Sequence, residues 1–258
     1  MKYFVVDAFT DSLFAGNPAG VALLEHPLDD ATMQAIATEN NLSETAFLLP
    51  AEHGYDLRWF TPAVEVDLCG HATLGSAFVL HKFGDAPGDR IDFFTKSGTL
   101  TARFDGDLIS LDLPARPPMP IELTADFATA VGCEVTEAYL SRDLLLLAKD
   151  AQAVRNAKPD FAALAELPVG FGVILTATGD DCDFVSRFFV PKGGVDEDPV
   201  TGSSHSTLVP FWSGRLGKQT MVAHQVSARG GVLYCQMRGD RVGIAGRAVL
   251  YMAGQIEF

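Results

Sequence analysis

The chain has 258 residues, 48% hydrophobic and 20% charged, as in a compact globular protein with a substantial core and unlike a disordered chain. A formal net charge of −14, offset by no Lys/Arg cluster, excludes nucleic-acid binding as a main function because such a surface repels phosphate backbones. The four cysteines form no C-x-x-C pair, no signal-peptide pattern opens the chain, and no apolar run reaches the roughly eighteen residues of a membrane span, so we expect reduced thiols, no membrane segment and a cytoplasmic location.

The first half of the chain combines strand patterns with two helical ones. A turn-rich loop at 11–24 leads into a strand, and further strands are expected at 2–9, 44–50, 55–62, 89–95, 98–105 and 108–114. A helix is expected at 28–41, with Asp29 and Asp30 at its favourable N-terminal end. A second helix, at 69–84, is apolar nearly all round, which predicts that it is buried inside a domain.

The proline-rich stretch "ARPPMP", residues 115–120, is the best candidate for a linker. After it we expect helices at 124–132 and 161–168 and strands at 138–148, 171–179 and 182–191. A second helix start and further short strands follow. The predicted domains are therefore residues 1–116 and 117–258, with the last strand able to pack on the first domain.

An internal duplication supports this division. The stretch "FTPAVEVDLCGHATLGSA" (60–77) resembles "FVPKGGVDEDPVTGSSHS" (189–206) at an offset of 129, and "SGTLTARFDGDLISL" resembles "GGVLYCQMRGDRVGI" at an offset of 133. The first offset matches Arg58 with Arg187, Phe60 with Phe189, Pro62 with Pro191 and Cys69 with Asp198. Two blocks in the same order predict an α+β fold of two similar halves that face each other across a pseudo-twofold axis.

Each copy has a strand, a loop and then a buried helix that begins with small residues. The first turn of such a helix carries unsatisfied N–H groups and a partial positive charge. Two such starts meeting at the axis would attract an anion, and Gly70, Gly75 and Gly202 would let it approach the backbone. We therefore expect a small carboxylate substrate, with a developing enolate stabilised by the same donors.

Four motifs in order, "NPAG", "NLSETAFL", "CGHATLG" and "DEDPVTGSS", resemble the phenazine-biosynthesis isomerase (PhzF-like) family over essentially the whole chain. The resemblance implies the diaminopimelate-epimerase-like fold, in which each domain is a curved sheet or barrel wrapped around a central helix. It also implies a homodimer and a cofactor-free isomerase without a metal. Glu44 would shuttle the proton, and His71, Asp198 and Ser203 would be the other polar site residues.

In the epimerase relatives, a cysteine at each helix start faces the substrate carbon. Here Cys69 is matched with Asp198, so a two-thiol racemisation is disfavoured and a proton shift by Glu44 is preferred. The expected catalytic residues are Glu44, Asp198 and His71. The expected substrate contacts are Asn17, Cys69, Gly70, Ala72, Thr201, Gly202 and Ser203.

Each of these residues also has a plain structural interpretation. Glu44 could be a solvated residue, and Asp198 before Pro199 has the pattern of a helix N-cap followed by proline at the first helical position. His71 could be a hydrogen-bonded core histidine. Cys69 could be a small apolar residue rather than a thiol activated by the helix. Asn17 could belong to an Asx turn and Ser203 to ordinary helix-start polarity.

Other chemistries lack their signatures. No G-x-S-x-G elbow accompanies the serines, and no dinucleotide or Walker loop is present. Cys69 and His71 stand two apart, but no second pair at ligand spacing follows, so the case for zinc is weak. The alternatives left open are an epimerase using Cys69 with a carboxylate partner and a non-catalytic protein that binds a small acid.

Overall fold

The computed structural model describes residues 1–84 and 88–258. It divides into unit 1, Met1–Asp112 with Ala245–Phe258, and unit 2, Leu113–Ile244. The boundary thus falls four residues before the one drawn from the sequence (116 − 112), and the C-terminal strand belongs to unit 1. No helix within the described residues is both long and apolar enough to cross a membrane.

Unit 1 is a curved sheet packed around one long helix. Its strands are β1 (Lys2–Ala8), β2 (Asn17–Leu23), β3 (Glu44–Ala51), β4 (Gly54–Phe60), β5 (Glu65–Val66), β6 (Arg90–Thr95), β7 (Gly98–Asp105), most of β8 (Leu108–Pro114) and β18 (Ala248–Gln255). Its helices are α1 (Asp30–Asn40) and α2 (Gly70–Phe83). Strand pairing runs β18-β1-β2-β3-β4-β6-β7-β8, parallel at β2–β3 and β4–β6 and antiparallel elsewhere.

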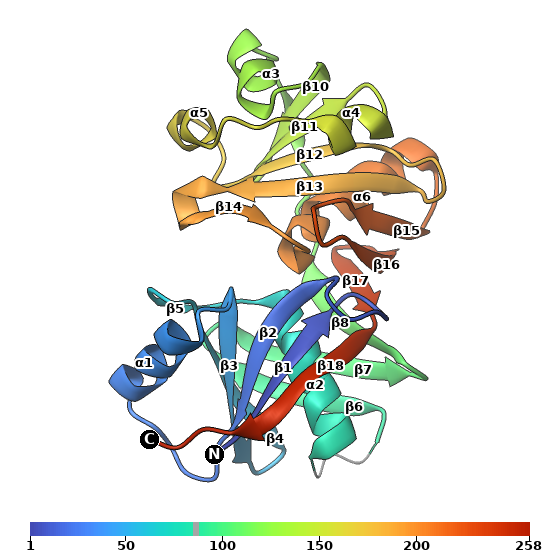
Figure 1. The fold of residues 1–258 in the computed structure, drawn as a ribbon. Helices are drawn as coiled ribbons and strands as arrows, with labels where there is room; N and C mark the ends of the chain where they lie inside the picture. Colours follow the sequence, from blue (N-terminus) through green and yellow to red (C-terminus); the bar gives the residue numbers. More distant parts are fainter. Residues whose placement is uncertain (85–87) are drawn as a thin grey trace. The chain divides into compact units, whose positions relative to one another are not determined.

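Helix α2 is the core helix of unit 1, as its apolar sequence predicted. It packs against β1, β2 and β3, and its residues from Gly70 to Ala77 are all buried (Figure 1). Helix α1 lies on the outer face of the sheet, where Met33 and Ile36 pack with Phe47. Asp29 caps α1 by accepting the Thr32 N–H at 2.9 Å, which confirms the predicted start.

Unit 2 repeats the same plan with more helical cover. Its strands are β9 (Met119–Ile121), β10 (Val135–Leu140), β11 (Leu144–Ala148), β12 (Val173–Thr178), β13 (Phe184–Val190), β14 (Val195–Asp198), β15 (Thr220–Gln225), β16 (Gly231–Arg238) and β17 (Arg241–Gly246). Its helices are α3 (Ala125–Val131), α4 (Ala151–Asn156), α5 (Phe161–Glu166) and α6 (Gly202–Leu216), with a short 3₁₀ turn, η1 (Pro191–Gly193). The order β9-β10-β11-β12-β13-β15-β16 has the same succession of parallel and antiparallel pairs as unit 1 from β18 to β7.

Two local predictions in unit 2 were wrong. The single strand expected at 138–148 is two antiparallel strands, because the chain turns where Ser141 N–H bonds to the carbonyl of Asp143. Helix α4 was not predicted, although Asp150 caps it by accepting the Ala153 N–H at 2.7 Å.

The proline-rich linker also supports a helix. Pro210 lies inside α6 and has no N–H to give to the carbonyl of Ser206 one turn earlier. That carbonyl accepts the N–H of Arg116 instead, at 2.8 Å. The predicted linker is therefore tied to unit 2, and it continues directly into β9.

Candidate functional site

The polar residues predicted for the first half come together at the start of α2, inside unit 1. Asn17 is the first residue of β2, Glu44 the first residue of β3, and His71 the second residue of α2. Because β2 and β3 run parallel with Ala19 opposite Glu44, and α2 packs on both strands, their side chains meet there. Gly70 and Ala72 are buried in the same helical turn.

His71 is the centre of this group. Its Nε2 lies 3.2 Å from Glu44 Oε2, and its Nδ1 lies 3.2 Å from Asn17 Nδ2 and 3.5 Å from Cys69 Sγ. An amide nitrogen can only donate, so Nδ1 accepts and the ring proton is on Nε2, facing the glutamate. The Glu44 contact has ion-pair distance but not hydrogen-bond angles.

Burial decides the charge of this histidine. It lowers the pKa of His71 to about 3, so the imidazole is neutral at working pH. The Glu44 side chain is 20% exposed, whereas that of His71 is 5% exposed. The carboxylate is therefore the solvent-reachable member of the pair, held on a strand rather than solvated after a helix.

The start of α2 leaves its first-turn N–H groups without a side-chain cap. Cys69 occupies the N-cap position and makes no capping bond, whereas aspartates cap α1, α4 and α5. Its carbonyl accepts the hydroxyl of Thr73 at 2.5 Å, a contact that the sequence analysis did not foresee. An uncapped helix start beside a partly exposed glutamate can bind a carboxylate next to a base.

The same group has the donor set of a metal site. One ligand atom each from Glu44, Cys69 and His71 lies within 4.8 Å of the others. The case for zinc was weak from the sequence because only Cys69 and His71 stand at ligand spacing. Glu44 was not predicted as a third ligand, since a contact between β3 and α2 leaves no local spacing signal. Carboxylate, thiolate and imidazole would fit zinc.

In unit 2 the predicted residues gather at the start of α6. Asp198 ends β14, and its Oδ2 accepts the Thr201 hydroxyl at 2.5 Å. Gln225, which the sequence analysis missed, accepts the Thr201 N–H at 2.8 Å and donates to the Asp198 carbonyl at 2.7 Å. Ser203 is half-buried in the first turn of the helix, and Gly202 is fully inside.

Asp198 is not the helix cap that its place before Pro199 predicted. Helix α6 begins three residues later, with Thr201 as N-cap and no side-chain cap bond. The chain remains extended through Asp198 because β14 pairs with β13, with Asp198 opposite Phe188. The carboxylate therefore braces the cap residue from the preceding strand.

The match between Cys69 and Asp198 is also wrong, because the two copies differ in length before the helix start. Arg58 binds Glu65 through two nitrogens, and Arg187 binds Glu197 in the same way, so the offset of 129 at the arginines becomes 132 at the glutamates. The second copy carries three extra residues between its arginine and its glutamate, in the stretch that includes η1. Thr201 is the counterpart of Cys69, and its carbonyl accepts His205 Nδ1–H as that of Cys69 accepts the Thr73 hydroxyl.

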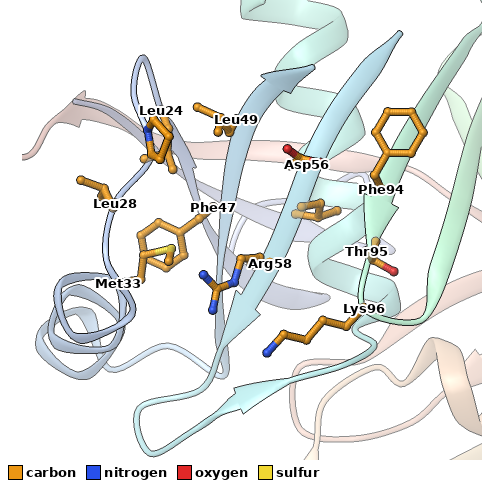
Figure 2. A pocket seen from close by; sticks show the side chains of 12 residues that line it. Leu24, Leu28, Met33, Phe47, Leu49, Asp56, Arg58, Phe94, Thr95 and Lys96 are labelled. Atoms are coloured by element: carbon orange, nitrogen blue, oxygen red, sulfur yellow. The ribbon is translucent and has the colours of Figure 1, made fainter. Parts of the chain in front are cut away.

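A separate pocket of about 400 Å³ lies on the outer face of unit 1. Figure 2 shows Phe47 beside Met33 and the Phe94 ring on the other side of the strand that carries Arg58. Both cations at its rim, Arg58 and Lys96, are already paired with Glu65. None of the predicted site residues lines this pocket.

Residues 6–254 match the sequence pattern of the family described as phenazine biosynthesis-like protein. The chain belongs to this family. It is 50% identical over 258 residues to an uncharacterized isomerase of Pseudomonas aeruginosa, covering 100% of this chain and 98% of the relative. It is 43% identical to the human phenazine biosynthesis-like domain-containing protein, covering 99% of each chain.

Solved structures confirm the predicted fold class. A crystal structure of a PhzF-family protein from Enterococcus faecalis has a TM-score of 0.98 and 47% identity, covering 100% of this chain and 99% of that one. A hydroxyproline epimerase from Agrobacterium vitis shares the fold at a TM-score of 0.66 and 12% identity, over 98% of this chain and 91% of that one. The architecture is thus that of the epimerase-type α+β proteins.

Proposed function

We propose that the protein is a cofactor-independent isomerase of a small carboxylic acid, in which Glu44 moves a proton between two positions of the substrate. The observation that carries this proposal is the contact of Glu44 with neutral, buried His71 beside the uncapped start of α2. Membership of the phenazine biosynthesis-like family, with relatives named isomerases, supports it.

The geometry suits Glu44 to both halves of the reaction. As a carboxylate it removes a proton α or vinylogous to the acid group, and as a carboxylic acid it returns that proton to another carbon. The substrate loses and regains one proton, so no external oxidant, reductant or second base is needed. Partial exposure places the carboxylate where a substrate C–H bond can come against it.

His71 and the helix start would hold the developing charge. Neutral His71 cannot supply a proton as a cation, but its Nε2–H can donate to the substrate oxygen on which negative charge grows. Asn17 fixes this tautomer from the other side of the ring. The N–H groups of Gly70, His71 and Ala72 would bind the substrate carboxylate, because the first N–H groups of a helix have no acceptor within it.

The test is Glu44→Gln, which keeps the shape and removes the base. Wild-type protein in D₂O is screened by proton NMR against small β,γ-unsaturated carboxylic acids, and each C–H exchange rate is measured. We expect Glu44→Gln to slow exchange by roughly 10²–10⁴-fold on any substrate found. Glu52→Gln is the matched control, because Glu52 lies just beyond the other end of β3 with its side chain 90% exposed. Exchange at the wild-type rate in Glu44→Gln would remove Glu44 from the chemistry.

Two further variants separate the alternatives. An epimerase that uses Cys69 loses exchange in Cys69→Ala, whereas the proposed reaction keeps most of it. A zinc-dependent reaction at Glu44, Cys69 and His71 loses activity on chelation and regains it with zinc. A protein that only binds an acid shows a thermal shift with the carboxylate and no exchange. The roles of Asp198, Thr201, Gly202 and Ser203 toward the substrate, the homodimer and the absence of a cofactor stay predictions.

A further inference from the structure

A second cluster of metal-binding side chains lies in unit 2 and contains none of the residues predicted for the reaction. Asp181 and Cys182 belong to the turn that joins β12 to β13 (Figure 1), and His224 lies on β15. One ligand atom from each residue falls within 4.8 Å of the other two. Carboxylate, thiolate and imidazole are the ligands that zinc takes in proteins.

The turn is fixed to β15, so the cluster is preformed. Asp183 N–H donates to the Val222 carbonyl at 2.8 Å, and the Asp183 carboxylate accepts the Val222 N–H at 2.7 Å. Lys218 binds the other oxygen of the same carboxylate at 2.5 Å. Strands β13 and β15 run parallel with Val185 opposite His224, which brings the imidazole beside the turn. Asp183 thus anchors the turn, Asp181 is exposed at its surface, and Cys182 is half-buried with its thiol donating to the Phe184 carbonyl at 3.2 Å.

The spacing is that of ligands around an ion rather than of a direct bond. His224 Nδ1 and Asp181 Oδ1 are 3.7 Å apart, beyond the roughly 3.2 Å of a hydrogen bond. Ligand atoms bound to tetrahedral zinc at about 2.0–2.3 Å lie about 3.3–3.8 Å from one another. The separation leaves room for a shared cation between the two groups.

The surroundings favour a cation that enters from solvent. The side chains of Asp181 and His224 are 70% and 27% exposed, so an ion can reach them and keep a water as its fourth ligand. Zinc binds cysteine as the thiolate, so a metal that binds here displaces the thiol proton of Cys182.

We propose that Asp181, Cys182 and His224 form a binding site for zinc or a similar borderline-soft divalent cation. The ion is bound by one carboxylate oxygen, the thiolate and Nδ1, with water in the open position. It joins the β12–β13 turn to β15 and stabilises unit 2.

The test is metal binding by the full-length chain after removal of metal with a chelator. Zinc chloride is titrated by calorimetry, and cobalt chloride by absorbance, which reports thiolate ligation and tetrahedral geometry. We expect the affinity to fall at least about 100-fold in Cys182→Ser and in His224→Gln. Cys133→Ser is the matched control, because Cys133 is also a half-buried thiol of unit 2 and belongs to no such cluster among the described residues.

Cys69→Ser separates this site from the cluster at the start of α2. Tight binding that survives Cys69→Ser and disappears in Cys182→Ser supports the proposal. Binding lost in Cys69→Ser and kept in Cys182→Ser overturns it, as does a wild-type chain that binds neither zinc nor cobalt tightly. Circular dichroism checks the fold of each variant, and should Cys182→Ser misfold, the more exposed His224→Gln decides.

Discussion

Two buried histidines show how burial selects a protonation state. His71 in unit 1 and His205 in unit 2 are both fully enclosed, and burial lowers their pKa values to about 3 and about 4. The carbonyl of Thr201 accepts His205 Nδ1–H and partly offsets that shift. Because a neutral imidazole takes part in catalysis only through its N–H or its lone pair, the proposed proton shift assigns the change of charge at the α2 start to Glu44.

These histidines predict a loss of stability in mild acid. In the unfolded chain each has a pKa near 6.5, so below that pH the unfolded chain binds more protons than the folded one. The free energy of unfolding is therefore highest above about pH 6.5 and falls toward pH 4, by about 1.4 kcal/mol per pH unit for each histidine. Urea unfolding at about pH 7 and pH 5 should show a loss of about 2 kcal/mol from each histidine.

The number of protons taken up on unfolding between about pH 7 and pH 5 should fall by close to one in His205→Gln. The control His53→Gln, at an exposed position, should leave this number unchanged. Glu65 affects stability only at lower pH. Arg58 lowers the pKa of Glu65 to about 2, so the stability that Glu65 contributes is lost only below its ordinary pKa of 4.5. An identical pH dependence of stability in His205→Gln and wild type would contradict the lowered pKa of His205 in the folded chain.

At the scale of elements, the two matched arginines, Arg58 and Arg187, make different contacts in their units. Both guanidiniums lie over a phenylalanine, Arg58 over Phe60 and Arg187 over Phe189. Arg187 also donates to the carbonyl of Ala157 after α4, at 2.8 Å, and is only 12% exposed. Each arginine thus ties a helix to its sheet, Arg187 through a backbone carbonyl after α4 and Arg58 through the Asp30 carboxylate at the start of α1.

We expect Arg187→Met to destabilise unit 2 by about 3–5 kcal/mol, since it leaves Glu197 and a carbonyl partly buried without their donor. Arg58→Met should cost about 1 kcal/mol, because Arg58 is 30% exposed, Asp30 is 78% exposed and Glu65 keeps its pair with Lys96. Urea unfolding of the two variants, followed by circular dichroism, measures the difference. Equal losses would mean that the contact with the chain after α4 contributes nothing.

Most helices and strands could be predicted from local periodicity, and the duplication from the two matched sequence blocks, whereas α4 was not predicted. The start of α6 could not be predicted in this way. Asp198-Pro199 has the pattern of a helix cap, but the pairing of β14 with β13 keeps the chain extended there. Matching the two copies at one offset of 129 also left out the three extra residues before Glu197. The pairs Arg58–Glu65 and Arg187–Glu197 show where these residues lie.

On the scale of the whole chain, unit 1 is completed by residues from the far end of the sequence. Strand β18 pairs with β1 along its length, from Lys2 opposite Gln255 to Ala8 opposite Ala248. The terminal amine of Met1 donates to the Ile256 carbonyl at 3.1 Å, and Ile256 N–H returns a bond to Met1 at 2.9 Å. Periodicity predicts that a strand exists but not which strand it pairs with, so the sequence left this partner open.

Ending the chain at Arg247 should therefore unfold unit 1 before unit 2. Without β18, strand β1 becomes an open edge that carries the buried side chains of Tyr3 and Val5. Amide hydrogen exchange should show loss of protection in β1 and β2 while β11 and β12 remain protected, because they pair only within unit 2 among the described residues. Proton transfer should be lost as well, since Asn17, Glu44 and His71 all lie in the weakened unit.

Removal of Glu257 and Phe258 alone is the control, because it spares the bonds between Ile256 and Met1. That shorter deletion should leave the protection of β1 unchanged. If the chain that ends at Arg247 loses protection equally in both units, the two units unfold as one cooperative body and β18 is not specific to the first. If β1 stays protected, pairing with β2 is enough to hold it, and the C-terminal strand adds little to the stability of unit 1.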